Sequence, residues 1–346
     1  MSAAQPVHAA VMTAVEKTVV ETRTIAPLEA SEVLVEVRSV GVCGSDVHWY
    51  RDGRIGSTVV SAPLILGHEA SGVIVKVGEG VPRNRIGSRV ALEPGVPCGR
   101  CALCRAGRYN LCPDVQFFAT PPVDGAFATH VVTHSDFAHD VPDSLDDDEA
   151  ALIEPLAVAM WAVGKASVTV GDRVLVSGAG PIGLLVLQVA RAAGADVSVS
   201  DVAGDRLVAA MQAGATDTID VSADELPPGF TVLIECSGVG AAISTGLAAL
   251  GPAGRAVLVG MSPDGQTSVP LDVIQSREIT LTGTFRYAHQ YPDAIALAAS
   301  GRIDLRRLVT SVHPLSDVHN ALMLPGRDPS ALKPMVHPQQ DENPPA

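Results

Sequence analysis

Four cysteines lie in one short segment of the chain, at a spacing that suits a metal ion. Two, two and seven residues separate Cys98, Cys101, Cys104 and Cys112. Four thiolates are the ligand set of a tetrahedral structural zinc site, in which no position stays open for a substrate. Disulfides and an iron–sulfur cluster are the alternatives, and a reducing compartment would disfavour disulfides. We therefore expect a structural zinc ion in this segment.

A second set of possible ligands combines one sulfur, one imidazole and carboxylate oxygens. Cys43 lies in GVCGSDVH, His68 and Glu69 follow in GHE, and Glu154 lies in IEP. Such mixed ligands are typical of a catalytic zinc ion that keeps one position for water or substrate. A lone histidine is more often a hydrogen-bonded core or surface residue, however, and a lone cysteine is more often inert. Spacing alone leaves both interpretations open.

A glycine-rich segment has the G-x-G-x-x-G pattern of a dinucleotide-binding turn. It follows an apolar run over residues 173–177 and opens a helical pattern, which is the context that the motif requires. The glycines permit a tight turn, a close approach of the backbone to a pyrophosphate and close packing of helix on strand. The phosphates would lie at the helix N-terminus. We expect cofactor contacts at Gly178, Gly180, Pro181, Ile182 and Gly183.

An acidic residue ends the next expected strand, about twenty residues after the glycine turn. Asp201 would accept hydrogen bonds from the adenosine ribose, and its charge would repel a 2′-phosphate, which favours NAD over NADP. Arg206 would flank the adenine or the ribose. Dinucleotides also contact the ends of later strands. We expect further cofactor contacts at Cys236, Val259, Gly260, Thr284, Phe285 and Arg286, although Cys236 is also typical of a small buried apolar residue.

The elements that must position these motifs follow two patterns. The first 150 or so residues form short apolar runs bounded by Gly or Pro, which indicate strands. From about residue 151, strands and helices alternate, which indicates a doubly wound parallel sheet with helices on both faces. The acidic run 143–150 suits the N-terminal turn of a helix better than a cation site. We expect an α/β protein with residues 153–286 inserted between 1–152 and 287–346.

Composition excludes several classes of partner. The 24 basic and 38 acidic residues give a net charge of −14, which argues against nucleic acid and anionic membranes. No segment reaches the ~18 apolar residues of a membrane span. The first residues have no basic region ahead of an apolar stretch, unlike a secretory signal. We expect a cytoplasmic protein with a small-molecule substrate.

The resemblance to a known family comes from a longer motif. Gly67-His68-Glu69-x2-Gly72-x5-Gly78-x2-Val81 matches the signature of zinc-type alcohol dehydrogenases. With GVCGSDVH, the four cysteines and the glycine turn, the chain resembles the zinc-dependent medium-chain dehydrogenases over nearly its whole length. Within them it looks most like the polyol (sorbitol and xylitol) dehydrogenases. The segments similar to theirs are GRIGS (53–57), GRYNLCPD (107–114), FFATPPVDG (117–125), ALIEPLAV (151–158) and GTFRY (283–287).

The resemblance implies a GroES-like catalytic domain, a Rossmann domain and a homotetramer. It also implies two zinc ions per subunit. Cys43, His68 and Glu69 would hold the catalytic one, and Glu154 stands where other alcohol dehydrogenases have a second cysteine ligand. Whether Glu154 binds this zinc transiently or holds its water stays open. Some polyol dehydrogenases lack the structural zinc, but this chain has all four of its cysteines.

The expected reaction is NAD-dependent oxidation of a secondary hydroxyl of a linear polyol to the ketose. Zinc would lower the pKa of the hydroxyl, and hydride would pass from the alkoxide to the nicotinamide. Ser45, His48 and Glu154 are candidates for moving the proton, and His48 would otherwise contact the cofactor. Arg286 would grip adjacent hydroxyls, unless it is a surface arginine. The expected substrate contacts are Ser45, Tyr50, Phe117, Phe118, Thr120, Glu154, Arg286 and Tyr287.

Other functions remain as alternatives. L-threonine 3-dehydrogenase shares the zinc architecture but lacks the FFATPP and GTFRY segments, and a glucose-type dehydrogenase is a further relative. A catalytically silent structural relative would be expected to lose metal ligands, whereas Cys43, His68 and Glu69 are all present. The sequence does not distinguish sorbitol, xylitol, ribitol and iditol, because one or two carbons change few contacts.

Overall fold

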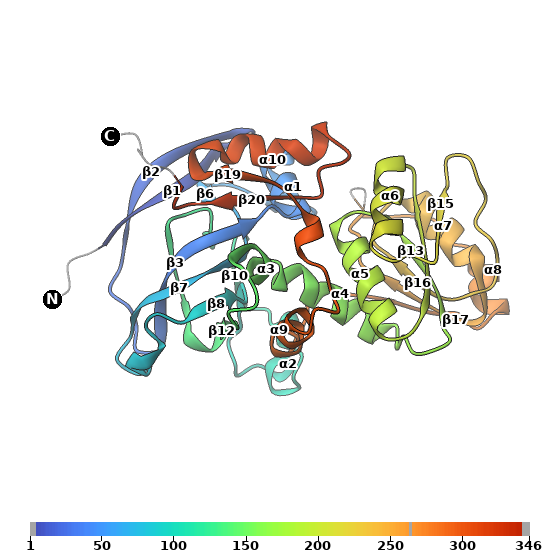
Figure 1. The fold of residues 1–346 in the computed structure, drawn as a ribbon, viewed down its shortest axis with the longest axis horizontal. Coiled ribbons are helices and arrows are strands. Elements are labelled where there is room, and N and C mark those ends of the chain that lie inside the picture. Colours follow the sequence, from blue (N-terminus) through green and yellow to red (C-terminus); the bar gives the residue numbers. More distant parts are fainter. Residues whose placement is uncertain (1–4, 263–264, 341–346) are drawn as a thin grey trace. The chain divides into compact units, whose positions relative to one another are not determined.

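The computed structural model describes residues 5–262 and 265–340, which form two compact units (Figure 1). The first unit contains Met1–Glu154, Tyr291–Ala299 and Leu305–Ala346. The second contains Pro155–Gln290 and Ser300–Asp304. In the described part of the chain, no helix is long and apolar enough to span a bilayer.

The first unit is built on a seven-stranded sheet with the order β12-β8-β7-β3-β20-β19, in which β11 also pairs with β3. Its pairs are antiparallel except β19 with β20. The strands are β3 (Glu32–Gly41), β7 (Glu69–Val77), β8 (Arg89–Leu92), β11 (His130–His134), β12 (Ala138–Asp140), β19 (Val309–Pro314) and β20 (Lys333–His337). Strand β3 is central, and Val33, Val35 and Val37 in it are fully buried.

Smaller sheets and short helices complete the first unit. The sheet β2-β1-β6 and the pairs β10-β9 and β4-β5 lie outside the main sheet. The strands are β1 (Gln5–Ala14), β2 (Lys17–Ile25), β4 (Arg54–Ile55), β5 (Thr58–Val59), β6 (Leu64–Ile65), β9 (Gly95–Val96) and β10 (Gln116–Phe117). The helices are α1 (Gly44–Asp52), α2 (Ala102–Arg105), α3 (Asp147–Ala151), α9 (Tyr291–Ala299) and α10 (Val318–Arg327).

The acidic run begins a helix, as its composition predicts. Asp146 is the N-cap of α3, and its side chain accepts a hydrogen bond from the Glu149 amide at 2.8 Å. The Glu149 carboxylate accepts from the Asp146 amide at 2.9 Å, which completes a capping box. These contacts satisfy amides that have no partner within the helix. The Asp146 and Glu149 carboxylates therefore cap the N-terminus of α3.

The second unit is a six-stranded parallel sheet with the order β15-β14-β13-β16-β17-β18. Its strands are β13 (Arg173–Ser177), β14 (Asp196–Asp201), β15 (Asp217–Asp220), β16 (Phe230–Glu235), β17 (Leu250–Leu258) and β18 (Thr280–Gly283). Its helices are α4 (Ile153–Lys165), whose first two residues belong to the first unit, α5 (Pro181–Ala192), α6 (Gly204–Gln212), α7 (Gly240–Ala249) and α8 (Leu271–Ser276). The prediction of a parallel α/β sheet is confirmed.

The order of the strands creates a binding edge. From β13 the chain runs outward to β14 and β15 on one side, and then returns to β16, β17 and β18 on the other. Because right-handed crossovers in opposite directions lie on opposite faces, α5 and α6 cover one face while α7 and α8 cover the other (Figure 1). The loops that follow β13 and β16 therefore diverge and leave a crevice at the carboxyl ends of the strands.

Candidate metal centres and dinucleotide site

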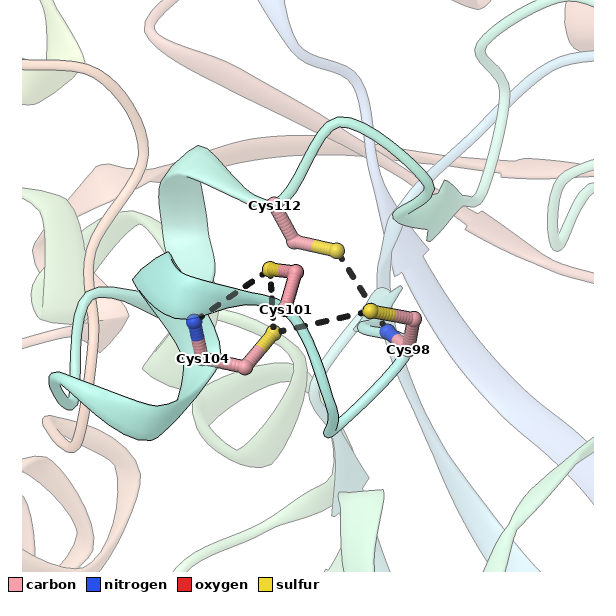
Figure 2. A group of neighbouring side chains, drawn as sticks. All are labelled: Cys98, Cys101, Cys104 and Cys112. Carbon is pink, nitrogen blue, oxygen red and sulfur yellow. Dashed lines mark hydrogen bonds between the residues drawn. The ribbon is translucent and has the colours of Figure 1, made fainter.

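The four cysteines of the spaced segment converge on one point in the first unit. Their sulfur atoms all lie within 4.8 Å of one another, and their side chains point toward a common centre (Figure 2). The Sγ atoms of Cys101 and Cys104 are 3.4 Å apart, and those of Cys98 and Cys104 are 4.0 Å apart. All four are free thiols, so the structure does not show the disulfide alternative. The donor set fits a structural zinc ion.

Backbone amides support the charged form of this cluster. The amide of Cys104 donates to Cys101 Sγ and that of Cys98 donates to Cys112 Sγ, each at 3.4 Å. Hydrogen bonds from the amides of Arg100 and Cys101 lower the pKa of Cys98 to about 7. Amide donors stabilise thiolates, which are the form that binds metal. The backbone amides therefore favour the thiolate at Cys98, whereas burial and the neighbouring thiols raise the pKa of Cys104 to about 12.

The loop that carries the cysteines is also tied to the main sheet. Tyr109, which lies between Cys104 and Cys112, donates its hydroxyl to Glu93 Oε1 at 2.6 Å. The other oxygen of Glu93 pairs with His139 Nε2 of β12 at 2.9 Å. Glu93 is buried, so both of its oxygens need partners. This pairing fixes the position of the loop relative to β8 and β12.

Three of the mixed ligands form a second cluster in the first unit. The ligand atoms of Cys43, His68 and Glu69 all lie within 4.8 Å of one another. Cys43 is the N-cap of α1, directly beyond the end of β3, and Glu69 is the first residue of β7. The antiparallel register pairs Gly41 with Glu69, which brings the two strand ends together. His68 and Glu69 are buried.

A residue that the sequence analysis missed orients the histidine. Asp46 is fully buried, and its Oδ1 lies 3.3 Å from His68 Nδ1 and accepts from the Gly67 amide at 2.9 Å. Its other oxygen accepts from the Cys43 amide at 3.1 Å. A carboxylate at Nδ1 leaves Nε2 directed at a metal. Burial lowers the pKa of His68, but Asp46 and Cys43 raise it more, and the net pKa lies well above the ordinary value.

A second missed residue is a buried lysine from the end of the chain. Lys333 of β20 is 2% exposed, and its Nζ lies 2.7 and 2.8 Å from the two carboxylate oxygens of Glu69. Its Nζ also donates to the Val42 carbonyl at 3.1 Å. Burial lowers the pKa of Lys333, but Glu69 and Cys43 outweigh burial and raise it. Lys333 is therefore a protonated partner of an expected zinc ligand.

The remaining expected residues of the first unit lie in different surroundings. Glu154 is buried, and its charge contributes to the raised pKa of Lys333. Among the described residues, the group of close ligand atoms contains Cys43 and its two partners but not Glu154. Ser45 is half-buried in the first turn of α1. His48 is half exposed, and its Nδ1 pairs with Asp52 at 3.0 Å.

Four other residues that we expect to contact the substrate are buried or half-buried in the first unit. Phe117 is buried, and its ring centroid lies 5.7 Å from that of His68, so it forms a wall of the metal centre. Phe118 is buried as well, and Thr120 is half-buried. Tyr50 is fully buried in the core, and its hydroxyl pairs with a histidine of α10 at 2.7 Å. Its contact with a substrate therefore stays a prediction.

The second unit contains a cavity of about 850 Å³ at the expected crevice, lined by Gly178, Gly180, Asp201, Arg206 and Cys236 among others. Helix α5 begins at Pro181, with Gly180 as its N-cap. A Cβ added at Gly180 would meet nothing within 4 Å, which leaves room for a ligand against the backbone. A Cβ at Gly183 would collide with the Gly178 carbonyl, so this glycine serves the close packing of helix on strand.

The acidic residue at the end of β14 holds the glycine turn in place. Asp201 Oδ2 accepts from the Ala179 amide at 2.7 Å. Its Oδ1 accepts from the Val202 and Ala203 amides at 2.8 and 2.9 Å. Because each carboxylate oxygen has two lone pairs, the carboxylate can still accept from a ribose. Asp201 therefore links the two loops that a dinucleotide would contact.

The later strand ends carry the other expected cofactor residues. Val259 and Gly260 donate their amides to the Glu235 carbonyl at 2.8 and 3.0 Å. Burial and then Glu235 raise the pKa of Cys236, as expected for an unreactive thiol. The Thr284 amide donates to the Leu258 carbonyl at 2.9 Å.

The segment after β18 supplies the last of these residues. The guanidinium of Arg286 lies 4.8 Å from the centroid of the exposed Phe285 ring. Tyr287 is buried. These residues belong to the second unit and the zinc ligands to the first, so their contact with a substrate stays a prediction.

Two family profiles match the chain. "Alcohol dehydrogenase GroES-like domain" matches residues 29–143, and "Zinc-binding dehydrogenase" matches residues 181–300. Sorbitol dehydrogenase of Bacillus subtilis is 42% identical over 97% of this chain and 98% of its own length. A probable D-xylulose reductase A of Neosartorya fischeri is 43% identical over 84% of this chain and 85% of its own length.

Solved structures show the same architecture. L-idonate 5-dehydrogenase of Escherichia coli has a TM-score of 0.92 at 29% identity, covering 96% of this chain and 99% of that one. The 2R,3R-butanediol dehydrogenase of Bacillus subtilis has a TM-score of 0.88 at 28% identity, covering 96% of this chain and 100% of that one. With its two clusters of metal ligands and its glycine turn in a parallel sheet, the chain belongs to the zinc-dependent medium-chain alcohol dehydrogenases.

Proposed function

We propose that the protein oxidises a secondary hydroxyl of a linear polyol to the ketose with NAD as acceptor. The observation that carries the proposal is the convergence of Cys43, His68 and Glu69 within 4.8 Å, in a chain 42% identical to a sorbitol dehydrogenase. One sulfur, one imidazole and one carboxylate fit a zinc ion with an open position. The four-cysteine cluster would hold a second, structural zinc.

The residues of the catalytic centre have separate tasks. Zinc, when bound, supplies a Lewis acid that makes a hydroxyl easier to deprotonate. Cys43, His68 and Glu69 would hold it, Asp46 would keep His68 Nε2 directed at it, and the Phe117 ring would exclude water from one side. Substrate hydroxyls that do not meet the metal need polar partners. For these we propose Ser45, Tyr50, Thr120, Glu154, Arg286 and Tyr287, with Phe118 as a further wall.

A route for the released proton runs along helix α1. Ser45 is half-buried in the first turn and His48 is half exposed one turn later. With Nδ1 of His48 held by Asp52, its Nε2 can pass a proton to solvent. Glu154 is the alternative acceptor, since it lies within electrostatic range of Lys333 beside the centre.

The cavity of the second unit would hold the dinucleotide. The pyrophosphate would lie at the N-terminus of α5, against Gly180, where amides have no partner within the helix. The adenosine ribose would bind Asp201. Asp224 and Glu225 also line the cavity, and their negative charges add to the repulsion of a 2′-phosphate. For this reason we propose NAD as the cofactor. We also propose a homotetramer, which the family resemblance implies, and a cytoplasmic location, which the sequence predicts.

Initial rates with a panel of substrates test the proposal. We expect four- to six-carbon polyols to be oxidised with NAD faster than L-threonine, and chelation to abolish the activity. Elemental analysis should give two zinc ions per chain, because the structure has two clusters of ligands. Preference for L-threonine, or full activity after complete removal of zinc, would contradict the proposal.

Asp201→Ser tests the choice of cofactor. Loss of the carboxylate removes the repulsion of a 2′-phosphate and the ribose acceptor, so the ratio of kcat/KM for NAD over NADP should fall by about tenfold or more. Asp196→Ser, at the exposed start of the same strand, is the matched control and should keep the ratio. An unchanged ratio in a folded Asp201→Ser protein would remove Asp201 from ribose recognition.

Cys101→Ser tests the structural site. Three thiolates bind zinc more weakly than four, so the zinc content should fall from two toward one and Tm should fall by ~5 °C or more. Turnover per catalytic zinc should be retained at low temperature. The measurements are thermal unfolding, elemental analysis and initial rates. A stable protein that has lost its turnover would show that the cluster acts in chemistry.

Asp46→Asn tests the orientation of His68. The amide has nearly the same shape but no charge, and loss of such a partner typically weakens metal binding by about 10–100-fold. We expect a loss in this range for the catalytic zinc, measured by competition with a chelator. Asp52→Asn, an exposed residue of the same helix, should leave zinc affinity at the wild-type value. Wild-type affinity in Asp46→Asn would refute the role.

A further inference from the structure

Lys333 is a buried cation that the proposed chemistry does not use. Its ammonium has three protons and three acceptors, namely the two carboxylate oxygens of Glu69 and the Val42 carbonyl. Val42 precedes Cys43, and Glu69 follows His68. The lysine therefore contacts one expected zinc ligand, Glu69, directly. Through the Val42 carbonyl it also contacts the residue that precedes a second ligand, Cys43.

The main sheet leaves space for this contact at a glycine of its central strand. Strands β7 and β20 lie on opposite sides of β3, so their side chains would normally be separated by a residue of β3. At that point β3 has Gly41, and an added Cβ would collide with Glu69 Oε2. The Glu69 carboxylate thus lies against the bare backbone of Gly41, where Lys333 reaches it. The glycine allows the ion pair to form across the central strand.

Negative charges surround Lys333 near the expected metal centre, and they determine its effect on a bound metal. Cys43, Glu69 and Glu154 contribute negative charge on its side of the centre, and Asp46 lies beyond His68. Both oxygens of Glu69 already accept from one ammonium, so a metal ion must share this carboxylate with a cation. A carboxylate shared with a cation donates less charge to a metal, and the two cations repel each other at low dielectric.

We propose that Lys333 is a positioning residue that holds Glu69 at the catalytic metal and limits how strongly Glu69 binds it. The inference rests on the proposed function, because it needs a metal ion at Cys43, His68 and Glu69. The lysine weakens metal binding and leaves the metal more electron-poor, which favours polarisation of a bound hydroxyl. It also neutralises Glu69 in the absence of metal, so that the site folds before the metal binds.

Lys333→Met is the direct test, because methionine keeps an unbranched apolar chain and removes the charge. Glu69 then has the metal as its main cationic partner. We expect zinc at this site to bind at least about tenfold more tightly, as measured by competition with a chelator. The rise in Tm on adding zinc should also exceed that of the wild type, since the metal-free variant retains an uncompensated buried carboxylate.

A double-mutant cycle shows whether the effect passes through Glu69. In the Glu69→Gln background, Lys333→Met should change zinc affinity by less than about twofold. In the cobalt(II)-substituted protein, the visible ligand-field spectrum of Lys333→Met should differ from that of the wild type. Cobalt at the four cysteines absorbs equally in both proteins, so its contribution cancels in the difference spectrum. Lys17→Met, which removes an exposed lysine of β2, is the matched control for the loss of one charge and should change neither readout.

Lys333→Gln keeps donors for Glu69 and the Val42 carbonyl, and it replaces the methionine variant if that variant does not fold. It should show the same tightening in smaller degree. Wild-type or weaker zinc affinity, with an unchanged cobalt spectrum, would overturn the inference and leave Lys333 as a structural residue. A wild-type protein that binds only one zinc, at the four cysteines, would instead overturn the proposed function and this inference together.

Discussion

The antiparallel pairing of β3 with β7 is the constraint on which the catalytic centre depends. It pairs Gly41 with Glu69, and the chain then leaves β3 through Cys43 as it enters β7 through His68. Two segments that lie apart in sequence thus place their ligands at one end of the sheet. Strand β20 extends the same sheet on the other side of β3 and brings Lys333 to the same end. The metal centre is therefore assembled by three adjacent strands, β7, β3 and β20.

Buried charge explains why this region has its particular residues. Asp46 and Glu69 are fully buried carboxylates, and an unpaired charge in such a place would strongly destabilise the fold. Asp46 is satisfied by two backbone amides and His68, and Glu69 by Lys333. The residues that satisfy these charges are also those that orient the ligands, so folding and metal binding depend on the same contacts.

The dinucleotide site follows a different principle. Its position comes from the order of strands in a parallel sheet, in which the loops after β13 and β16 diverge. Asp201 shows how a local motif and a long-range contact combine there. It ends β14 as the motif requires, and it also accepts from the Ala179 amide of the glycine turn. The carboxylate thus holds the glycine turn in position without a bound ribose.

The sequence by itself determined the four-cysteine site and the dinucleotide turn, because the motifs that carry them are local. The four cysteines lie in one short loop, the glycines lie in one turn, and their spacing is set by the geometry of the ligand that they would hold. The alternation of strands and helices likewise predicted the parallel sheet, since hydrophobic periodicity is a local property.

Only the tertiary structure decided which distant residues meet at the centre. Lys333 lies 264 residues from Glu69, and a lysine in an apolar strand gives no signal of its partner. Asp46 was visible as a residue of the same motif, but its contact with His68 depends on the pairing of β3 with β7. Tyr50 is a further example, because its hydroxyl pairs with His319, which lies 269 residues away. Burial and strand order are global properties, and they assign each charged or aromatic side chain its partner.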